Sequence, residues 1–206
     1  MTGDAKLIEF FRWSDRVDIK SLFTRDFSAV VGDLDPDMEM LEFISRLPPE
    51  ISPLSKMLGL DQRFFLSDHN LLYTDKMSMA AGVEVRVPFL DLELFKWARS
   101  IPSNYKQRGF EGKWALKKAM EPYLPKSVIY RKKSGFGVPL RRWMRNEFRE
   151  MVSTVLSREK LMSRGIFDVG AVHNLIRSND RGELDGSYTL LSLICIELWC
   201  RRFIDA

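Results

Sequence analysis

DKMSMAAGVEVRVPFLD, residues 75–91, places charged side chains inside an apolar part of the chain. Asp75 lies four residues after Leu71 and four before Met79, so a helix would put all three side chains on one face. A segment that only packed against a core would gain little from such a charge. The carboxylate therefore suggests a polar site, and the residues that follow supply further polar groups.

Residues 83–87 alternate strictly between valine and a charged residue, ending at Pro88. In an extended segment this alternation places the valines on one side and the pair Glu84 and Arg86 on the other. Together with the preceding carboxylate, this pattern predicts the wall of a polar cleft. It is also the only plausible strand in the sequence.

Five charged residues of this stretch have two possible roles: Asp75, Lys76, Glu84, Arg86 and Asp91. They could line a ligand site, or they could form a self-contained ion-pair network that braces the core. Asp91 could also act simply as the N-cap of the following helix. The residues alone leave these interpretations open.

The composition indicates a folded protein without a membrane segment. At 206 residues with 45% apolar residues, the chain can bury a substantial core and does not resemble a disordered segment. The N-terminus shows no secretory signal pattern, and the most apolar stretch, 188–200, is shorter than the roughly 20 residues of a membrane span. We expect a cytoplasmic protein without membrane contact.

Cysteine and histidine spacing predicts no metal site. On a helix, Cys195 and Cys200 would point about 140° apart, which excludes a local disulfide or a shared metal. His69 and His173 have no Cys or His at ligand spacing. The acidic residues of 33–37 lack the glycine that a calcium loop needs at its sixth position.

The pattern of apolar residues, caps and prolines predicts a mainly helical chain. Asp35 should begin one helix, Asp68 should cap the helix that carries Asp75, and Asp91 should cap the next. The expected helices lie in 4–31 (two or three short ones), from 35, and near 54–66, 68–80, 91–100, 111–121, 139–163, 168–178 and 186–204, with a loop at 103–110.

Gly112 and Lys113 lie at the predicted start of the helix 111–121. A lysine there opposes the helix dipole, and Lys117 one turn later adds like-charge repulsion. A bound anion would remove both penalties, so the pattern suggests a phosphate ligand group. The alternative is an exposed lysine, screened by Glu111, that binds nothing.

A basic stretch follows, because 126–145 contains seven Lys or Arg and no acid. Its segment 131–139, RKKSGFGVP, has two glycines that would let the backbone approach a charged ligand closely. It matches neither the dinucleotide-binding nor the Walker pattern. The charge suits a phosphate-bearing ligand or an acidic partner, and a solvated basic face would explain it equally well.

Three segments in this order and spacing carry a resemblance: DKMSMA…VEVRVPFLD, EGKWALKKA and LPKSVIYRKKSGFGVP. They closely resemble the C-terminal synthetase domain of glutamine-dependent asparagine synthetases. The resemblance is dense over 68–145, and 1–67 and 146–206 fit the flanking helical regions. Lys76 and Lys117 stand where the family commonly has arginine, which changes the hydrogen-bond geometry but keeps the charge.

This resemblance implies a fold and an activity. The expected fold is mainly α: a single helical lobe, 1–206, forming the C-terminal portion of an α/β ATP-pyrophosphatase-type domain, with at most a short extended segment near 83–87. The implied reaction uses ATP and Mg²⁺ to adenylate a carboxylate, normally that of aspartate, which ammonia from glutamine then aminates. The products are asparagine, AMP and pyrophosphate.

The resemblance also assigns site residues. Lys113 matches the lysine that contacts the phosphates or the adenylated intermediate. Candidate residues that line or brace the cleft are Asp75, Lys76, Glu84, Arg86, Asp91 and Lys133. We expect Lys113 and the Glu84/Arg86 pair to face one shared hollow.

The family's loops S-G-G-x-D-S and S-G-E-G-x-D-E do not occur in the sequence, and residue 2 is Thr where the glutaminase nucleophile would be Cys. We therefore expect the isolated chain to be inactive, to hold no tightly bound cofactor and to need a nucleotide-binding half and a glutaminase domain, or a separate chain that supplies them. Exposed apolar surface could also lead to a homo-oligomer.

Three alternatives stay open at this point. The acceptor could be a sugar carboxylate of surface-polysaccharide biosynthesis rather than aspartate. The chain could instead be a noncatalytic module that pairs with a separate nucleotide-binding half. Nucleic-acid binding is the least expected, because the resemblance already accounts for the basic residues.

Overall fold

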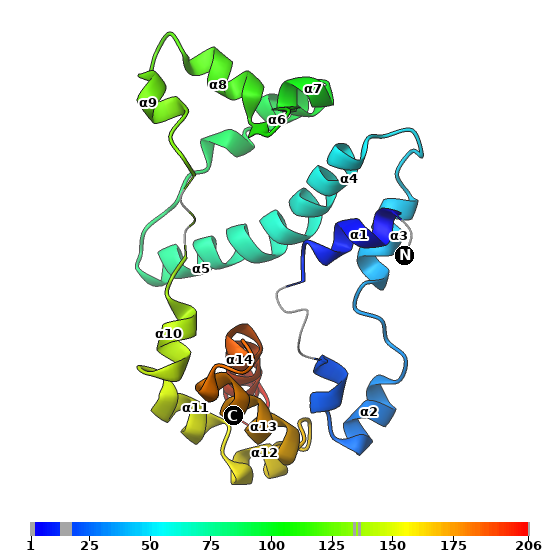
Figure 1. Ribbon diagram of the computed structural model, residues 1–206, viewed down its shortest axis with the longest axis vertical. Coiled ribbons are helices and arrows are strands. Elements are labelled where there is room, and N and C mark those ends of the chain that lie inside the picture. Colours follow the sequence, from blue (N-terminus) through cyan, green and yellow to red (C-terminus); the bar gives the residue numbers. More distant parts are fainter. Residues whose placement is uncertain (1–2, 13–17, 134, 136, 206) are drawn as a thin grey trace. The chain divides into compact units, whose positions relative to one another are not determined.

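The helices of the computed structural model form two compact units, shown in Figure 1. The structure describes residues 3–12, 18–133, 135 and 137–205. The first unit contains residues 1–11 and 37–134, and the second contains 12–36 and 135–206. In the described residues the chain is mainly helical, as the sequence predicts.

The first unit carries the segments 75–91 and 111–119, part of the segment 124–139, and one short hairpin. Its hairpin pairs β1 (Gln107–Arg108) with β2 (Glu111–Gly112). Its helices are α1 (Gly3–Glu9), α3 (Met38–Ser45), α4 (Pro53–Leu60), the π-helix η2 (Asp61–Leu71), α5 (Leu72–Ala80), the 3-10 helix η3 (Pro88–Leu90), α6 (Leu92–Ser100), α7 (Ser103–Lys106), α8 (Trp114–Met120) and α9 (Lys126–Ile129).

The segments α4, η2 and α5 form one uninterrupted helix, seen in cyan to blue-green in Figure 1. The residues at both junctions, Leu60 and Leu72, have right-handed helical backbone angles. Within the π-helical part the rings of Phe65 and His69 stack, and His69 also meets the ring of Tyr73 edge-on. This helix therefore runs without a break from Pro53 to Ala80 and leads directly into the segment 83–91.

The second unit packs around a larger core. Its elements are the 3-10 helix η1 (Ile19–Leu22), α2 (Arg25–Val31), α10 (Leu140–Arg145), α11 (Arg149–Val155), α12 (Arg158–Arg164), α13 (Val169–Arg181) and α14 (Ser187–Phe203). Leu190, Leu193 and Ile194 of α14 are buried in this core, together with Met144 and Val172. Cys200 is buried and Cys195 is exposed, and neither forms a disulfide, as their spacing predicts.

Three local predictions are wrong. Residues 83–87 form no strand, and the strands that pair among the described residues lie at 107–108 and 111–112, where the sequence predicts a loop over 103–110. Asp68 caps no helix, since it lies inside η2. The helix expected from Asp35 begins at Met38.

Asp91 caps α6 as expected, because its Oδ1 accepts hydrogen bonds from the backbone N–H groups of Glu93 (3.1 Å) and Leu94 (2.9 Å). Among the residues that the structure describes, no helix is long and apolar enough to cross a membrane.

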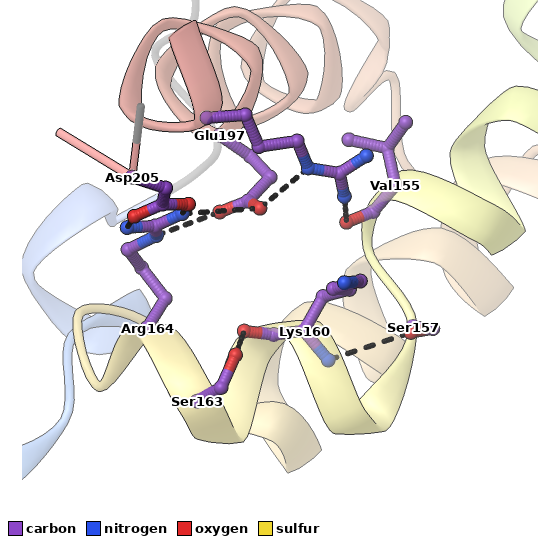
Figure 2. Close-up of polar contacts among 8 residues, drawn as sticks. Val155, Ser157, Lys160, Ser163, Arg164, Glu197 and Asp205 are labelled. Atoms are coloured by element: carbon purple, nitrogen blue, oxygen red, sulfur yellow. Dashed lines mark hydrogen bonds and ion pairs between the residues drawn. The ribbon is translucent and has the colours of Figure 1, made fainter. Parts of the chain in front are cut away.

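A buried carboxylate joins two helices of the second unit (Figure 2). Glu197 of α14 accepts a hydrogen bond from Nε of Arg164 at 2.9 Å and another from Nε of Arg201 at 2.8 Å. Arg164 also donates to Asp205 at 2.6 Å, and Arg201 reaches the carbonyl oxygen of Val155. The network ties α12 and the end of α11 to the last helix.

The environment of Glu197 favours its ionised form. Burial alone would raise the pKa of the Glu197 carboxyl, but the hydrogen bonds from Arg164 and Arg201 outweigh burial and lower it. The hydrogen bond from Arg164 likewise lowers the pKa of Asp205. Because the folded-state pKa of Glu197 lies below the ordinary value of 4.5, its contribution is complete above that pH and is lost as the pH falls further.

We predict that Glu197→Gln lowers the free energy of unfolding by roughly 3 kcal/mol at pH 7, because it leaves two partly buried guanidinium groups without their shared negative charge. The difference from wild type should shrink as the pH falls below about 4.5. Chemical denaturation of both proteins between about pH 3.5 and pH 7 measures this.

Glu183→Gln is the matched control, because Glu183 is exposed and lies 3.6 Å from its partner Arg181. Its effect should stay within about 0.5 kcal/mol at every pH. A difference between wild type and Glu197→Gln that does not change with pH would contradict the assigned role of Glu197.

Candidate functional site

The first unit contains a hollow of about 1160 Å³, which we call the α4–α8 hollow. It is lined by residues of α3, α4, η3, α6, α7 and α8 and by the hairpin. Its walls are largely apolar, with Leu47, Leu54, Phe95 and Ile101 among them. Pockets for small ligands typically measure about 300–1,000 Å³, so a nucleotide-sized ligand has room here.

Lys113 lines the α4–α8 hollow and has an unusual backbone. With φ of 57° and ψ of 32°, it is the only non-glycine residue with positive φ among those described. A left-handed residue other than glycine costs roughly 1–2 kcal/mol. Strain of this kind concentrates at functional sites, where the surrounding structure maintains it. The backbone of Lys113 therefore supports a functional role independently of its charge.

The structure places Lys113 at the N-cap of α8, one residue before the helix begins. Lys113 is exposed, and Glu111 forms its ion pair with Lys117 at 3.0 Å rather than with Lys113. Lys113 has no acidic partner among the described residues.

Three further cations line the same hollow: Arg63, Arg99 and Lys106. Arg63 lies 3.4 Å from Asp68, whereas Arg99 and Lys106 have no acidic partner within the described ranges. The lining contains no Asp or Glu. The hollow therefore combines apolar walls with uncompensated positive charge, a combination suited to an anion.

The patterns considered in the sequence did not single out Arg99 or Lys106. Gly109, with φ of 60°, lies in the turn between the two strands. A glycine between two short polar segments is a signal of a hairpin turn, and a hairpin over 107–112 has Lys106 and Lys113 as its flanking residues. This turn was the available signal for Lys106.

A polar network braces the elements next to Lys113. Lys117 pairs with Glu111, and its Nζ lies 5.3 Å from the centroid of the Tyr130 ring. The Tyr130 hydroxyl donates to Glu121, which also accepts from Lys118 at 2.7 Å. The hydrogen bond from Lys118, and after it the one from Tyr130, lowers the pKa of the Glu121 carboxyl. The hydrogen bond to Glu121 raises the pKa of the Tyr130 hydroxyl.

The other candidate residues do not line the α4–α8 hollow, so the structure does not bring them together with Lys113 there. Glu84 and Arg86 pair with each other at 2.8 Å on an exposed segment. Asp75 and Lys76 lie exposed on α5, without an ion pair to any described residue. Their roles stay predictions.

Lys133 is exposed in the basic segment. The neighbouring Ser134 and Phe136 fall outside the described residues. The Lys133 assignment therefore also stays a prediction.

Exposed apolar side chains recur along α5, the segment after it and α6. We call these side chains the 72–97 surface, after the range over which they occur. They are Leu72, Tyr73, Met77, Met79, Val83, Val85, Val87, Phe89, Leu92, Leu94 and Trp97. Surfaces of this kind usually mark contacts with another protein part.

Among the described residues, no group of three or more His, Cys, Asp or Glu side chains could hold a metal ion.

Comparison of the sequence with known proteins identifies the family of this chain. The sequence profile described as asparagine synthase matches residues 5–201, which is nearly the whole chain. The chain belongs to the asparagine synthase family. The segment 68–145, which carries the resemblance, lies inside the matched region.

The chain spans only a small part of the length of the relatives that it matches. Asparagine synthetase (glutamine-hydrolyzing) 1 of Bacillus subtilis is 32% identical over 148 residues, covering 72% of this chain and 23% of that protein. Asparagine synthetase (glutamine-hydrolyzing) 3 of Arabidopsis thaliana is 40% identical over 79 residues, covering 34% and 14%. No solved structure matches the chain.

We predict that Lys113→Gly raises the free energy of unfolding by about 1 kcal/mol, because glycine adopts the left-handed conformation without strain. Lys113→Ala removes the same charge but keeps the strain, so Lys113→Gly should be about 1 kcal/mol more stable than Lys113→Ala. Denaturant titration of the three proteins gives the comparison. Equal stabilities for Lys113→Gly and Lys113→Ala would mean that the backbone at this position is not strained.

Proposed function

We propose that this chain is the helical part of an ATP-dependent amidotransferase. In this reaction ATP adenylates a carboxylate, and ammonia derived from glutamine then displaces AMP to form the amide. The observation that carries the proposal is Lys113, a strained cation without an acidic partner among the described residues, on a hollow in a chain that belongs to the asparagine synthase family. The acceptor that the family name indicates is aspartate.

Lys113 would act on negative charge. Adenylation releases pyrophosphate, and the attack of ammonia develops negative charge on the acyl oxygen. A cation beside apolar walls stabilises such charge more strongly than it would in water. The pair Lys117–Glu111 supports this role, because it holds β2 and α8 on both sides of Lys113.

The nucleotide-binding loops would come from a further protein part. We propose that the 72–97 surface packs against this part, on the same polypeptide or on a separate chain. Its exposed apolar side chains support the proposal, because burial of each large one contributes about 1.5–3 kcal/mol. The full-length enzyme would use ATP with Mg²⁺.

Two alternatives to this proposal can each be tested separately. A sugar carboxylate could replace aspartate as acceptor, and the chain could act as a noncatalytic module beside a separate nucleotide-binding half. Product analysis with aspartate and with uronic acids decides the first. Capture of a stable partner carrying the S-G-G-x-D-S loop decides the second.

We predict that the 206-residue chain alone releases no AMP from ATP, Mg²⁺, aspartate and ammonia. In the full-length protein, Lys113→Gln should lower AMP release by about 100-fold or more, because it removes a cation at the developing charge. Chromatographic quantification of AMP and asparagine measures both.

Lys96→Gln serves as the control, because Lys96 is exposed on α6, pairs with Glu93 and does not line the hollow. It should keep nearly full activity. AMP release by the isolated chain, or full activity of the Lys113→Gln enzyme, would refute the proposed arrangement.

The 72–97 surface should also drive self-association of the isolated chain. Light scattering should show a mass that rises with concentration, and Trp97→Lys should weaken this rise because it places a charge among exposed apolar side chains. Val30→Lys is the matched control, because it places the same charge at an exposed apolar residue outside 72–97. A monomer at all concentrations for wild type would contradict the assignment of this surface.

A further inference from the structure

The register of the hairpin brings two lysines together. Gln107 pairs with Gly112 and Arg108 pairs with Glu111 in the antiparallel ladder. Lys106 and Lys113 flank this ladder, one directly before Gln107 and the other directly after Gly112.

Both lysines contribute to the α4–α8 hollow, so they line the same space. The Nζ atom of Lys106 donates one hydrogen bond to the carbonyl oxygen of Arg99, at 3.0 Å. This contact holds the Lys106 side chain against the end of α6. An ammonium group has three donors, so further donors stay available for a ligand.

Two positive charges that line the same hollow repel each other. Neither lysine has an acidic partner among the described residues, and the hollow lining contains no carboxylate that could compensate them. Arg99, also on the lining, adds a third cation. An anion between the two lysines would turn this repulsion into attraction.

We propose that Lys106 is a second anion-binding residue and that it forms, with Lys113, a two-lysine clamp for a multiply charged oxyanion. This deepens the proposed function and rests on it. The shared ligand chemistry is a group with at least two negative charges on oxygen, either the phosphate chain of ATP and pyrophosphate or the carboxylates of the acceptor.

The test measures binding of inorganic pyrophosphate, and in a second arm of aspartate, to the 206-residue chain by isothermal titration calorimetry at low ionic strength. Lys106→Gln and Lys113→Gln should each weaken pyrophosphate binding about tenfold or more, and the double variant should bind none measurably. Lys96→Gln is the control and should bind as wild type does.

A second measurement uses stability without ligand. At low salt and without pyrophosphate, Lys106→Gln should melt at a higher temperature than wild type, because it removes one of two repelling charges. Added pyrophosphate should raise the melting temperature of wild type and not that of the double variant. A variant that merely misfolds would melt lower in both conditions.

The outcomes separate the clamp from the proposed function. Wild-type affinity in Lys106→Gln with lost affinity in Lys113→Gln overturns the clamp and leaves the proposed role of Lys113 intact. Unchanged affinity in both variants, or no binding by wild type, overturns the clamp and also counts against Lys113 as a ligand group. Loss of aspartate binding in both variants supports a clamp that holds the acceptor.

Discussion

Two residue pairs between Gln107–Arg108 and Glu111–Gly112 fix the geometry of the candidate site. A ladder this short is marginal by itself. Its support comes from Trp114, which packs against Tyr105 with ring centroids 5.6 Å apart, while the guanidinium of Arg108 lies 5.3 Å from the centroid of the Trp114 ring. These contacts join the hairpin to α7 and α8, so the left-handed turn at Lys113 is held from both ends.

The two units differ in how their own residues stabilise them. The second unit has a continuous core that includes Met144, Leu156, Val172 and Leu190, and a buried charge network on its last helix. In the first unit the described core cluster is centred on Ile8, Ile44 and Leu60. Much of its apolar surface therefore remains available for contacts with other protein parts.

The elements that depend on local chemistry could be predicted from the sequence. The N-cap at Asp91, the helical character of the chain and the position of Lys113 at a helix start all follow from caps and periodicity. The strand expected at 83–87 failed because alternation specifies faces but not a partner strand. Asp68 failed because a favourable cap residue also tolerates an exposed position inside a helix.

The site could be predicted only in part. The charge of Lys113 and its family match were visible in the sequence, whereas its backbone strain and its neighbour Lys106 depend on the hairpin register. Arg99 reaches the hollow only because α6 borders it together with α4 and α7. Such convergence depends on tertiary contacts that no local pattern encodes.

The π-helical segment η2 changes the direction in which the residues after it project from the helix axis. In an α-helix each residue turns the helix by about 100°, and a π-helical segment changes this advance over its whole length. The direction in which Asp75 and Lys76 project relative to α4 is thus set by the winding of 61–71. Loss or gain of one residue there would swing both side chains by about a quarter turn while their local sequence stayed the same.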